Sequence, residues 1–126
     1  ITAIELPPRG DSGGDCYLRF IPRTEMDIAV VGCAINVVLE GDKITSARIA
    51  LGAVAPTIVV VPEAAEAIIG TALDDAALEK MVAAVRAACR PISDKRGTAE
   101  FRTHVAGVLA RRAAETALRR AKGEKA

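Results

Sequence analysis

The sequence predicts an α+β domain in which a three-stranded antiparallel sheet is covered on one face by about three helices. Three observations lead to this fold class. An aliphatic run, 28–39, is joined by the short turn 40–43 to a second alternating run, 44–51, as in a β-hairpin. Residues 16–23 alternate as a third strand, and the second half of the chain has the 3.6-residue periodicity of amphipathic helices. Because a lone hairpin is marginal in water, the helices are expected to cover it.

The predicted hairpin is the most strongly patterned part of the chain. Residues 28–39 carry no charged side chain, so both faces of this strand are expected to be covered at least in part. Gly41 and Asp42 suit a tight turn, because glycine takes positive φ without steric cost and aspartate tolerates turn geometry. In the return strand, Arg48 falls by parity on one face and the apolar residues on the other. This strand ends at a bend of small residues, 52–56, where the backbone is open to close approach.

The predicted first strand carries two of the three aromatic residues of the chain. Tyr17 and Phe20 fall on opposite faces by parity, and Arg23 and Asp27 follow in the bend toward the hairpin. Two interpretations are open at this point. The aromatic side chains either pack in the core or at its rim, or they line a planar ligand to which the charged side chains add directed hydrogen bonds.

Three helices are expected after the hairpin. The first covers 62–69 and opens with a proline, which suits a first helical position. The second follows a capping Asp74 and ends before Pro91. The third begins after a capping Thr98 and continues to about Ala121, where cationic side chains favour the helix dipole.

The chain is organised as one domain with two flanking segments. Residues 16–121 are expected to form the domain, which is large enough to bury a sizeable core. Residues 1–15 are expected to be the end of a preceding domain and a flexible glycine-rich loop, and 122–126 a frayed basic tail. Since 51% of residues are apolar and only 2% aromatic, the core must consist of Ala, Val, Ile and Leu.

Composition gives no reason to expect a nucleic acid or a membrane as partner. The net charge is +1, and the basic residues near the C-terminus have no aromatic residues among them. No apolar run approaches the roughly 18 residues of a transmembrane helix. The three cysteines lie far apart without a CxxC pair, which predicts reduced thiols in a cytoplasmic protein and no metal site.

The residues by themselves predict no reaction. Residues 10–14 spell GDSGG, as at the nucleophile of chymotrypsin-like serine proteases, but a catalytic triad needs a histidine to take the serine proton. The one histidine, His104, lies in a predicted helix and follows the serine, which is the reverse of the order in that family. The sequence has no metal-ligand spacing and no phosphate-binding loop.

Three blocks of sequence carry a family resemblance. They are YLRFIPRTEMDIA (17–29), ALGAVAPT (50–57) and RPISDKRGTAEFR (90–102). In this order and at these distances they resemble the C-terminal domain of the FAD-binding medium subunit of molybdenum hydroxylases, the enzymes of the carbon monoxide dehydrogenase and xanthine dehydrogenase type. Each block is weak alone, whereas three in register are specific. The resemblance extends from residue 16 to about 118.

The resemblance implies a part in an oxidoreductase. In such enzymes a molybdopterin large subunit oxidises the substrate, and an iron–sulfur small subunit passes electrons to FAD in the medium subunit. The implied partners are these two subunits and the N-terminal FAD-binding domain of the same subunit. The glycine-rich loops that hold the FAD phosphates belong to that N-terminal domain and are absent here. FAD binding by this chain alone is therefore expected to be weak or absent, and the chain alone inactive.

The resemblance also implies site residues. The family's positions beside the isoalloxazine ring fall on Tyr17, Phe20, Arg23, Asp27, Ile28, Gly52 and Ala53. Capping and ion pairing that fix the last helix are assigned to Asp94, Arg96, Glu100 and Arg102. An alternative function stays open, namely a non-catalytic interaction domain that docks a partner chain through its exposed strand and aromatics. Either function predicts an exposed apolar patch, through which this chain by itself is expected to form a homodimer.

Overall fold

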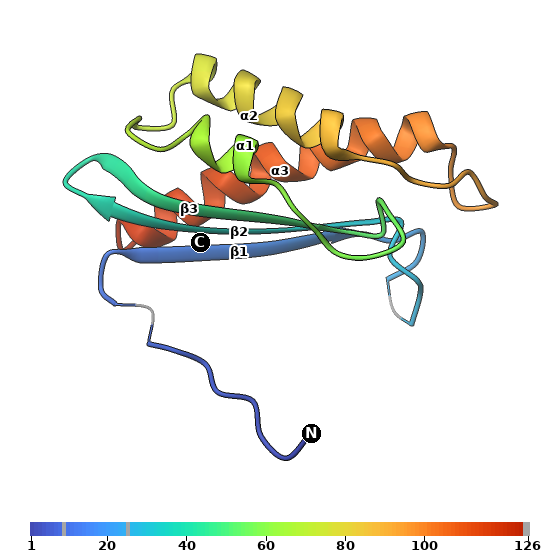
Figure 1. Cartoon of the computed structure of the whole chain (residues 1–126), viewed down its shortest axis with the longest axis horizontal. Coiled ribbons are helices and arrows are strands. Elements are labelled where there is room, and N and C mark those ends of the chain that lie inside the picture. The colour runs from blue at the N-terminus through green and yellow to red at the C-terminus, as the bar shows by residue number, and fades with distance from the viewer. Residues whose placement is uncertain (9, 25, 125–126) are drawn as a thin grey trace.

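The computed structural model describes residues 1–8, 10–24 and 26–124. Residue 9, in the loop expected before the domain, and residues 125–126, in the expected basic tail, lie outside the described residues. The described elements follow one another along the chain as shown in Figure 1. They are β1 (Gly13–Phe20), β2 (Val31–Glu40), β3 (Lys43–Gly52), β4 (Val59–Val60), α1 (Pro62–Glu66), α2 (Asp75–Ala88) and α3 (Ala99–Ala121).

The sheet has the strand order β1-β2-β3-β4, with every neighbouring pair antiparallel. The hairpin prediction is confirmed, since Glu40 pairs with Lys43 and Gly41 has a φ of 59° in the turn. The sequence predicts three strands, whereas the described sheet has a fourth, short strand at its edge. After the bend, Val59 and Val60 pair with the end of β3 along its free edge. A two-residue strand is too short to show alternation, so the sequence pattern did not reveal it.

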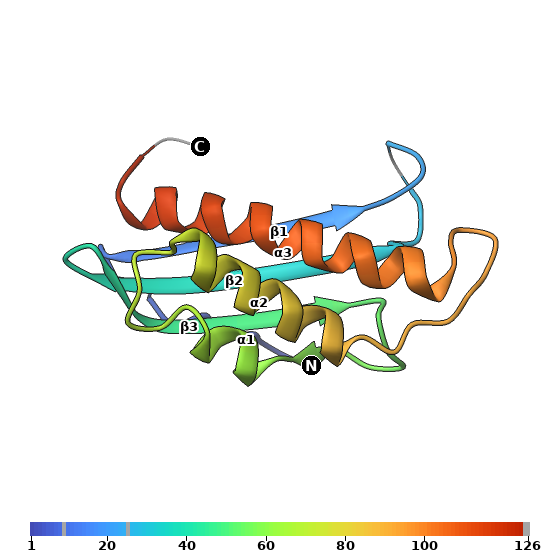
Figure 2. The ribbon, with the colours of Figure 1, turned by 90° about the horizontal axis from the view of Figure 1, so that it is seen from above.

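All three helices lie on one side of the sheet (Figures 1 and 2). The side chains of β2 that face them, from Val31 to Leu39 in alternation, are buried, whereas the intervening Ala34, Asn36 and Val38 are half-buried. None of the described helices covers the second side, which we call the open face. Residues 1–8 are exposed and run below the open face without joining the sheet. The described chain therefore buries one face of its sheet only.

Helix α3 lies against β1 and β2 through small side chains. Its fully buried residues include Ala106, Ala110, Ala113 and Ala117. The closest approach is at Gly14, where an added Cβ would collide with the main chain of Ala117 and lie 2.5 Å from the nitrogen of Ala121. A helix can come this close to a strand only where both surfaces lack bulk, which explains a tight core with almost no aromatic residues.

The helix starts confirm the predicted caps. Asp74 Oδ1 accepts a hydrogen bond from the main-chain nitrogen of Ala77 at 2.9 Å, and Thr98 Oγ1 accepts one from that of Phe101 at 3.1 Å. Other boundaries moved. β1 begins three residues earlier than the expected strand and ends at Phe20, before Pro22. Helix α1 ends at Glu66, short of the expected residue 69.

Candidate functional site

Three loops meet at one end of the domain, which we call the loop end (Figures 1 and 2). They are the β1–β2 loop (21–24 and 26–30), the β3–β4 loop (53–58) and the α2–α3 loop (89–98). The main-chain nitrogen of Arg90 donates to the carbonyl of Val54 at 2.7 Å, which joins the second loop to the third. The first and third are joined through Asp27 and Arg96, whose guanidinium nitrogens lie 3.4 Å from Oδ1 of Asp27.

Asp27 is the centre of the polar contacts at the loop end. Its Oδ2 accepts a hydrogen bond from Arg23 Nε at 3.2 Å, and its Oδ1 accepts one from the main-chain nitrogen of Ile28 at 2.8 Å. The carboxyl side chain is only 6% exposed. Desolvation by itself raises the pKa of Asp27, but the Ile28 N–H and the charges of Arg23 and Arg96 outweigh it and hold the pKa below its usual value. The carboxylate therefore stays ionised and bound.

A second ion pair joins the α2–α3 loop to α3. Arg102 is buried, and its Nη2 pairs with Oδ1 of Asp94 at 2.5 Å. Its Nη1 donates to the main-chain carbonyl of Val30 at 3.0 Å. The hydrogen bond from Arg102 and that from the Arg96 main chain hold the pKa of Asp94 below its usual value. These contacts fix the α2–α3 loop against the start of β2.

Tyr17 lies on the open face at the loop end. Its ring covers Gly32, because a Cβ added there would be 2.9 Å from the tyrosine hydroxyl oxygen. Ala34 pairs with Tyr17 in the sheet register, and Gly52 pairs with Gly32. A shallow hollow of about 250 Å³ lies beside the tyrosine ring, which is 62% exposed, and is lined by Ala34 and Ala50 together with Asn36 and Arg48. The open face therefore offers an aromatic face above a flat floor.

Phe20 lies on the opposite side of the sheet from Tyr17. Its ring meets Phe101 of α3 edge to face, with ring centroids 5.9 Å apart at an interplanar angle of 69°. The two neighbouring aromatics of the first strand therefore do not form a pair that lines one planar ligand. Instead, Phe20 attaches the end of β1 to the beginning of α3, and it is 38% exposed.

The other residues expected at the site surround the loop end. Ile28 is 66% exposed beside Asp27. Gly52 ends β3, and a Cβ there would meet only the end of the Ile58 side chain, at 3.6 Å. Ala53 has a φ of 61°, a left-handed conformation that a residue with a side chain rarely adopts. The structure thus groups Tyr17, Ile28 and the β3–β4 bend at one end of the sheet.

Sequence reasoning missed two residues of this site. Gly32 lies beneath Tyr17, and a glycine within a predicted strand was the signal that could have revealed the close approach. Arg96 was assigned to the last helix, but its guanidinium contacts Asp27 instead. Only its main-chain nitrogen serves the expected turn, by donating to Asp94 Oδ1 at 2.8 Å. The pairing spans 69 residues, so no local pattern announces it.

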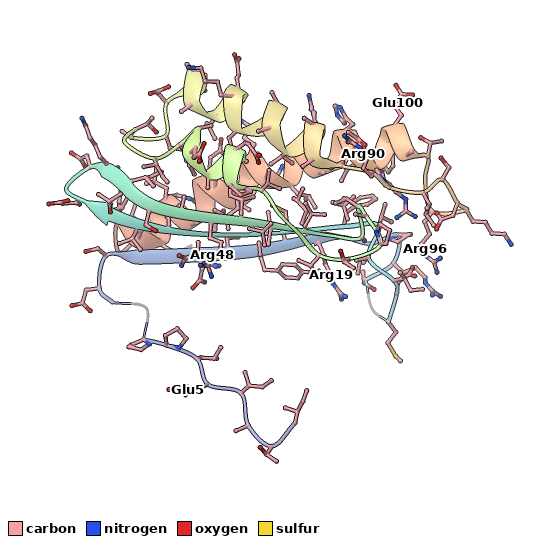
Figure 3. The ribbon with its side chains drawn as sticks, in the orientation of Figure 1. Glu5, Arg19, Arg48, Arg90, Arg96 and Glu100 are labelled. Carbon is pink, nitrogen blue, oxygen red and sulfur yellow. The ribbon has the colours of Figure 1, made fainter. Side chains whose placement is uncertain are left out.

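The open face also carries charge. Arg19 and Arg48 project from the sheet on the side away from the helices (Figure 3). Neither side chain has an ion-pair or hydrogen-bond partner among residues 1–8, 10–24 and 26–124. Within those residues no group of three or more His, Cys, Asp or Glu side chains is placed to hold a metal ion. None of the described helices has both the length and the apolar character that crossing a membrane requires.

Comparison with known proteins places this fold in a family. The family model of the CO dehydrogenase flavoprotein C-terminal domain matches residues 17–117. The carbon monoxide dehydrogenase medium chain of Afipia carboxidovorans is 42% identical over 122 residues, which cover 97% of this chain and 42% of the relative. The xanthine dehydrogenase FAD-binding subunit of Escherichia coli O157:H7 is 26% identical over 125 residues, covering 98% of this chain and 43% of the relative.

A solved structure agrees with these sequence relatives. Reconstituted CO dehydrogenase from Oligotropha carboxidovorans contains a chain that superposes with a TM-score of 0.85 at 41% identity, over 93% of this chain and 40% of that one. The present chain thus spans about two fifths of the length of the relatives it matches. The matched residues include the β1–β2, β3–β4 and α2–α3 loops of the loop end. The chain belongs to the family of CO dehydrogenase flavoprotein C-terminal domains.

Proposed function

We propose that this chain is the C-terminal domain of the flavin-binding medium subunit of a molybdenum hydroxylase-type oxidoreductase, and that its loop end forms one wall of the FAD isoalloxazine site. The names of its relatives, a carbon monoxide dehydrogenase medium chain and a FAD-binding subunit, support the cofactor and the reaction class. The single observation that carries the site is Tyr17, whose exposed ring lies over Gly32 beside a shallow hollow.

The residues of the loop end fit a flat, largely apolar ring system. The face of Tyr17 can stack on it, and exposed Ile28 can shield its edge from water. The backbone at Gly52 and Ala53 has no bulky side chain in the way and can approach a ring closely. FAD, when bound, would supply the redox centre between iron–sulfur clusters and an electron acceptor.

Two of the remaining predicted residues, Asp27 and Phe20, act indirectly. The Asp27 side chain is only 6% exposed and accepts the main-chain N–H of Ile28, so we assign it to holding Ile28 in place and not to contact with the ring. Phe20 fixes the end of β1 through its contact with Phe101. Arg23 is 72% exposed and keeps guanidinium donors free of Asp27, so it remains available to a polar edge of a ligand.

The partners follow from the same proposal. The N-terminal FAD-binding domain of the subunit would hold the FAD phosphates, and the molybdopterin large subunit and iron–sulfur small subunit would deliver the electrons. Three buried free thiols fit a cytoplasmic protein. The function of a non-catalytic docking module is not favoured, since its relatives are oxidoreductase subunits.

The exposed apolar side chains of the open face and β3–β4 segment also support association of this chain with itself. Tyr17, Ile58 and Val60 are 62%, 69% and 55% exposed. Two isolated copies are expected to cover these side chains as a weak homodimer. Sedimentation of the isolated chain over a range of concentrations tests this, and a strict monomer at high concentration contradicts it.

The decisive experiment compares flavin properties in the complete FAD-loaded subunit. Tyr17→Ala is expected to raise the fluorescence of the flavin and to shift its reduction potential, because a stacked aromatic ring quenches the emission and shields the ring from water. Tyr17→Phe should retain both properties. Ile69→Ala, at an exposed position after α1, is the control. Unchanged fluorescence and potential in Tyr17→Ala would remove this wall from the flavin site.

A further inference from the structure

We propose that Arg96, on the α2–α3 loop, is a positioning residue for the flavin wall, because it fixes the β1–β2 loop segment that presents Ile28. This inference rests on the function proposed above. The sequence assigned Arg96 to fixing α3, whereas this inference gives it a role in the flavin site. Figure 3 shows Arg96 at the loop end, beside the β1–β2 loop.

The first step is the contact itself. Arg96 presents two nitrogens, Nε and Nη2, to the same oxygen of Asp27, each at 3.4 Å. That oxygen, Oδ1, also accepts the main-chain N–H of Ile28 at 2.8 Å. The carboxylate therefore connects the guanidinium of one loop to the backbone of the next. The orientation of the Ile28 backbone follows from where Arg96 holds this oxygen.

The second step is that Arg96 is itself fixed. Its main-chain N–H donates to Asp94 Oδ1 at 2.8 Å, and Asp94 and Gly97 exchange two main-chain hydrogen bonds at 3.1 and 3.2 Å. Asp94 in turn pairs with the buried Arg102. A rigid turn, anchored to α3, thus carries the guanidinium, and a mobile surface arginine would not position a loop in this way.

The third step concerns Val30, at the other end of the loop segment. Arg102, which holds Asp94, also donates to the carbonyl of Val30 at 3.0 Å. Arg96 therefore holds one end of the segment 27–30, and Arg102 holds the other. Arg96 lies in the turn before α3, and Arg102 lies in the first turn of α3 itself. A four-residue segment pinned at both ends has little freedom, which is what a wall beside a cofactor requires.

Arg23 provides the matched comparison. It also contacts the Asp27 carboxylate, with Nε 3.2 Å from Oδ2, but it lies only four residues earlier in the same loop. The Arg23 side chain is 72% exposed, against 34% for Arg96. Its ion pair is thus screened by water and ties the loop only to itself. Loss of Arg23 leaves the connection to α3 intact, whereas loss of Arg96 removes it.

The test uses Arg96→Gln, Arg96→Lys and Arg23→Gln in the complete FAD-loaded subunit. Amide hydrogen exchange is measured at Ile28 and Val30, and the flavin fluorescence and reduction potential are measured in parallel. We expect Arg96→Gln to speed exchange at Ile28 by about tenfold and to change both flavin properties. Arg23→Gln should leave exchange within about twofold of the wild type. Arg96→Lys, which keeps the charge but not the planar fork, should be intermediate.

Each outcome separates this inference from the proposed function. Wild-type exchange in Arg96→Gln overturns the positioning role. Faster exchange with unchanged flavin properties also overturns it, and the proposed function then stands if Tyr17→Ala does change them. If neither Arg96→Gln nor Tyr17→Ala alters the fluorescence or the reduction potential of the flavin, the proposed site itself is wrong. Equal increases in amide exchange at Ile28 in Arg23→Gln and Arg96→Gln would show that the charge next to Asp27 matters and that the connection to α3 does not.

Discussion

Arg102 donates a hydrogen bond from Nη1 to the main-chain carbonyl of Val30 across 3.0 Å, and this contact joins the first turn of α3 to the residue before β2. The arginine is 4% exposed, and its Nε has no hydrogen-bond partner among the described residues. Removing a charged group from water is costly, so such a residue persists only where its contacts are needed. Here they hold together the loop end of the domain.

The first prediction concerns this buried arginine. Arg102→Met should destabilise the domain by about 1–3 kcal/mol, because the Val30 carbonyl loses its partner in a region that water does not reach. The control is Arg111→Met, since Arg111 is 45% exposed and its partner Asp75 is 86% exposed. That change should cost about 0–1 kcal/mol. Urea unfolding followed by circular dichroism measures both, and equal losses would contradict the prediction.

The second prediction concerns the crossing of α3 over β1. Gly14→Ala should destabilise the domain by about 1–3 kcal/mol or more, because the added methyl group collides with the main chain of α3 at Ala117 and Ala121. Gly52→Ala is the comparison, because its added Cβ makes only an ordinary contact with Ile58 at 3.6 Å. Thermal unfolding of the two variants should separate them clearly. A stable Gly14→Ala protein would show that α3 can move away from the sheet.

The third prediction concerns the buried thiols. Burial, with smaller effects from the neighbouring Cys16 and Cys89, raises the pKa of Cys33 to about 12. Burial also raises the pKa of Cys89. Because the thiolate is the reactive form, a disulfide reagent at pH 8 should modify neither thiol in the folded domain and all three after unfolding. Rapid reaction of Cys33 in the native state would mean that the sheet opens readily.

The fourth prediction concerns acid. The folded-state pKa values of Asp27 and Asp94 are lowered from 3.8. Their ion pairs therefore contribute stability that is fully present above pH 3.8 and is lost as the pH falls through the lower, folded-state values.

Carboxyl chemical shifts followed during an acid titration test this directly. Both groups should titrate with a pKa below 3.8, and Asp94→Asn should weaken the dependence of unfolding on pH in this acid range. If the two carboxyl groups titrate at or above 3.8, the guanidinium contacts of the loop end are not formed in solution.

The starts of α2 and α3 and the hairpin could be read from local patterns. An aspartate before α2 and a threonine before α3 cap the helices as their positions indicate, because a cap acts on a nitrogen three residues away. The turn at Gly41 is equally local. The two-residue strand β4 could not be found in this way, since it exists only because the edge of β3 is free to pair.

The candidate site shows the same division. Family likeness pointed to Tyr17, Phe20 and Asp27, and the strand parity already separated the two aromatics. The parity did not show that Phe20 rests on Phe101, or that Tyr17 covers Gly32. Both contacts depend on how α3 and β2 lie against β1. The partner of Arg96 was missed for the same reason, because 69 residues separate it from Asp27.

The sequence by itself determined the fold class, the hairpin, the two helix caps and the family, because each depends on residues close together in the chain or on blocks held in order. Only the tertiary structure decided which face of the sheet stays open and which arginine holds the loop beside it. Those features depend on contacts between loops distant in sequence, and their geometry is set when the alanine-rich face of α3 closes on the sheet.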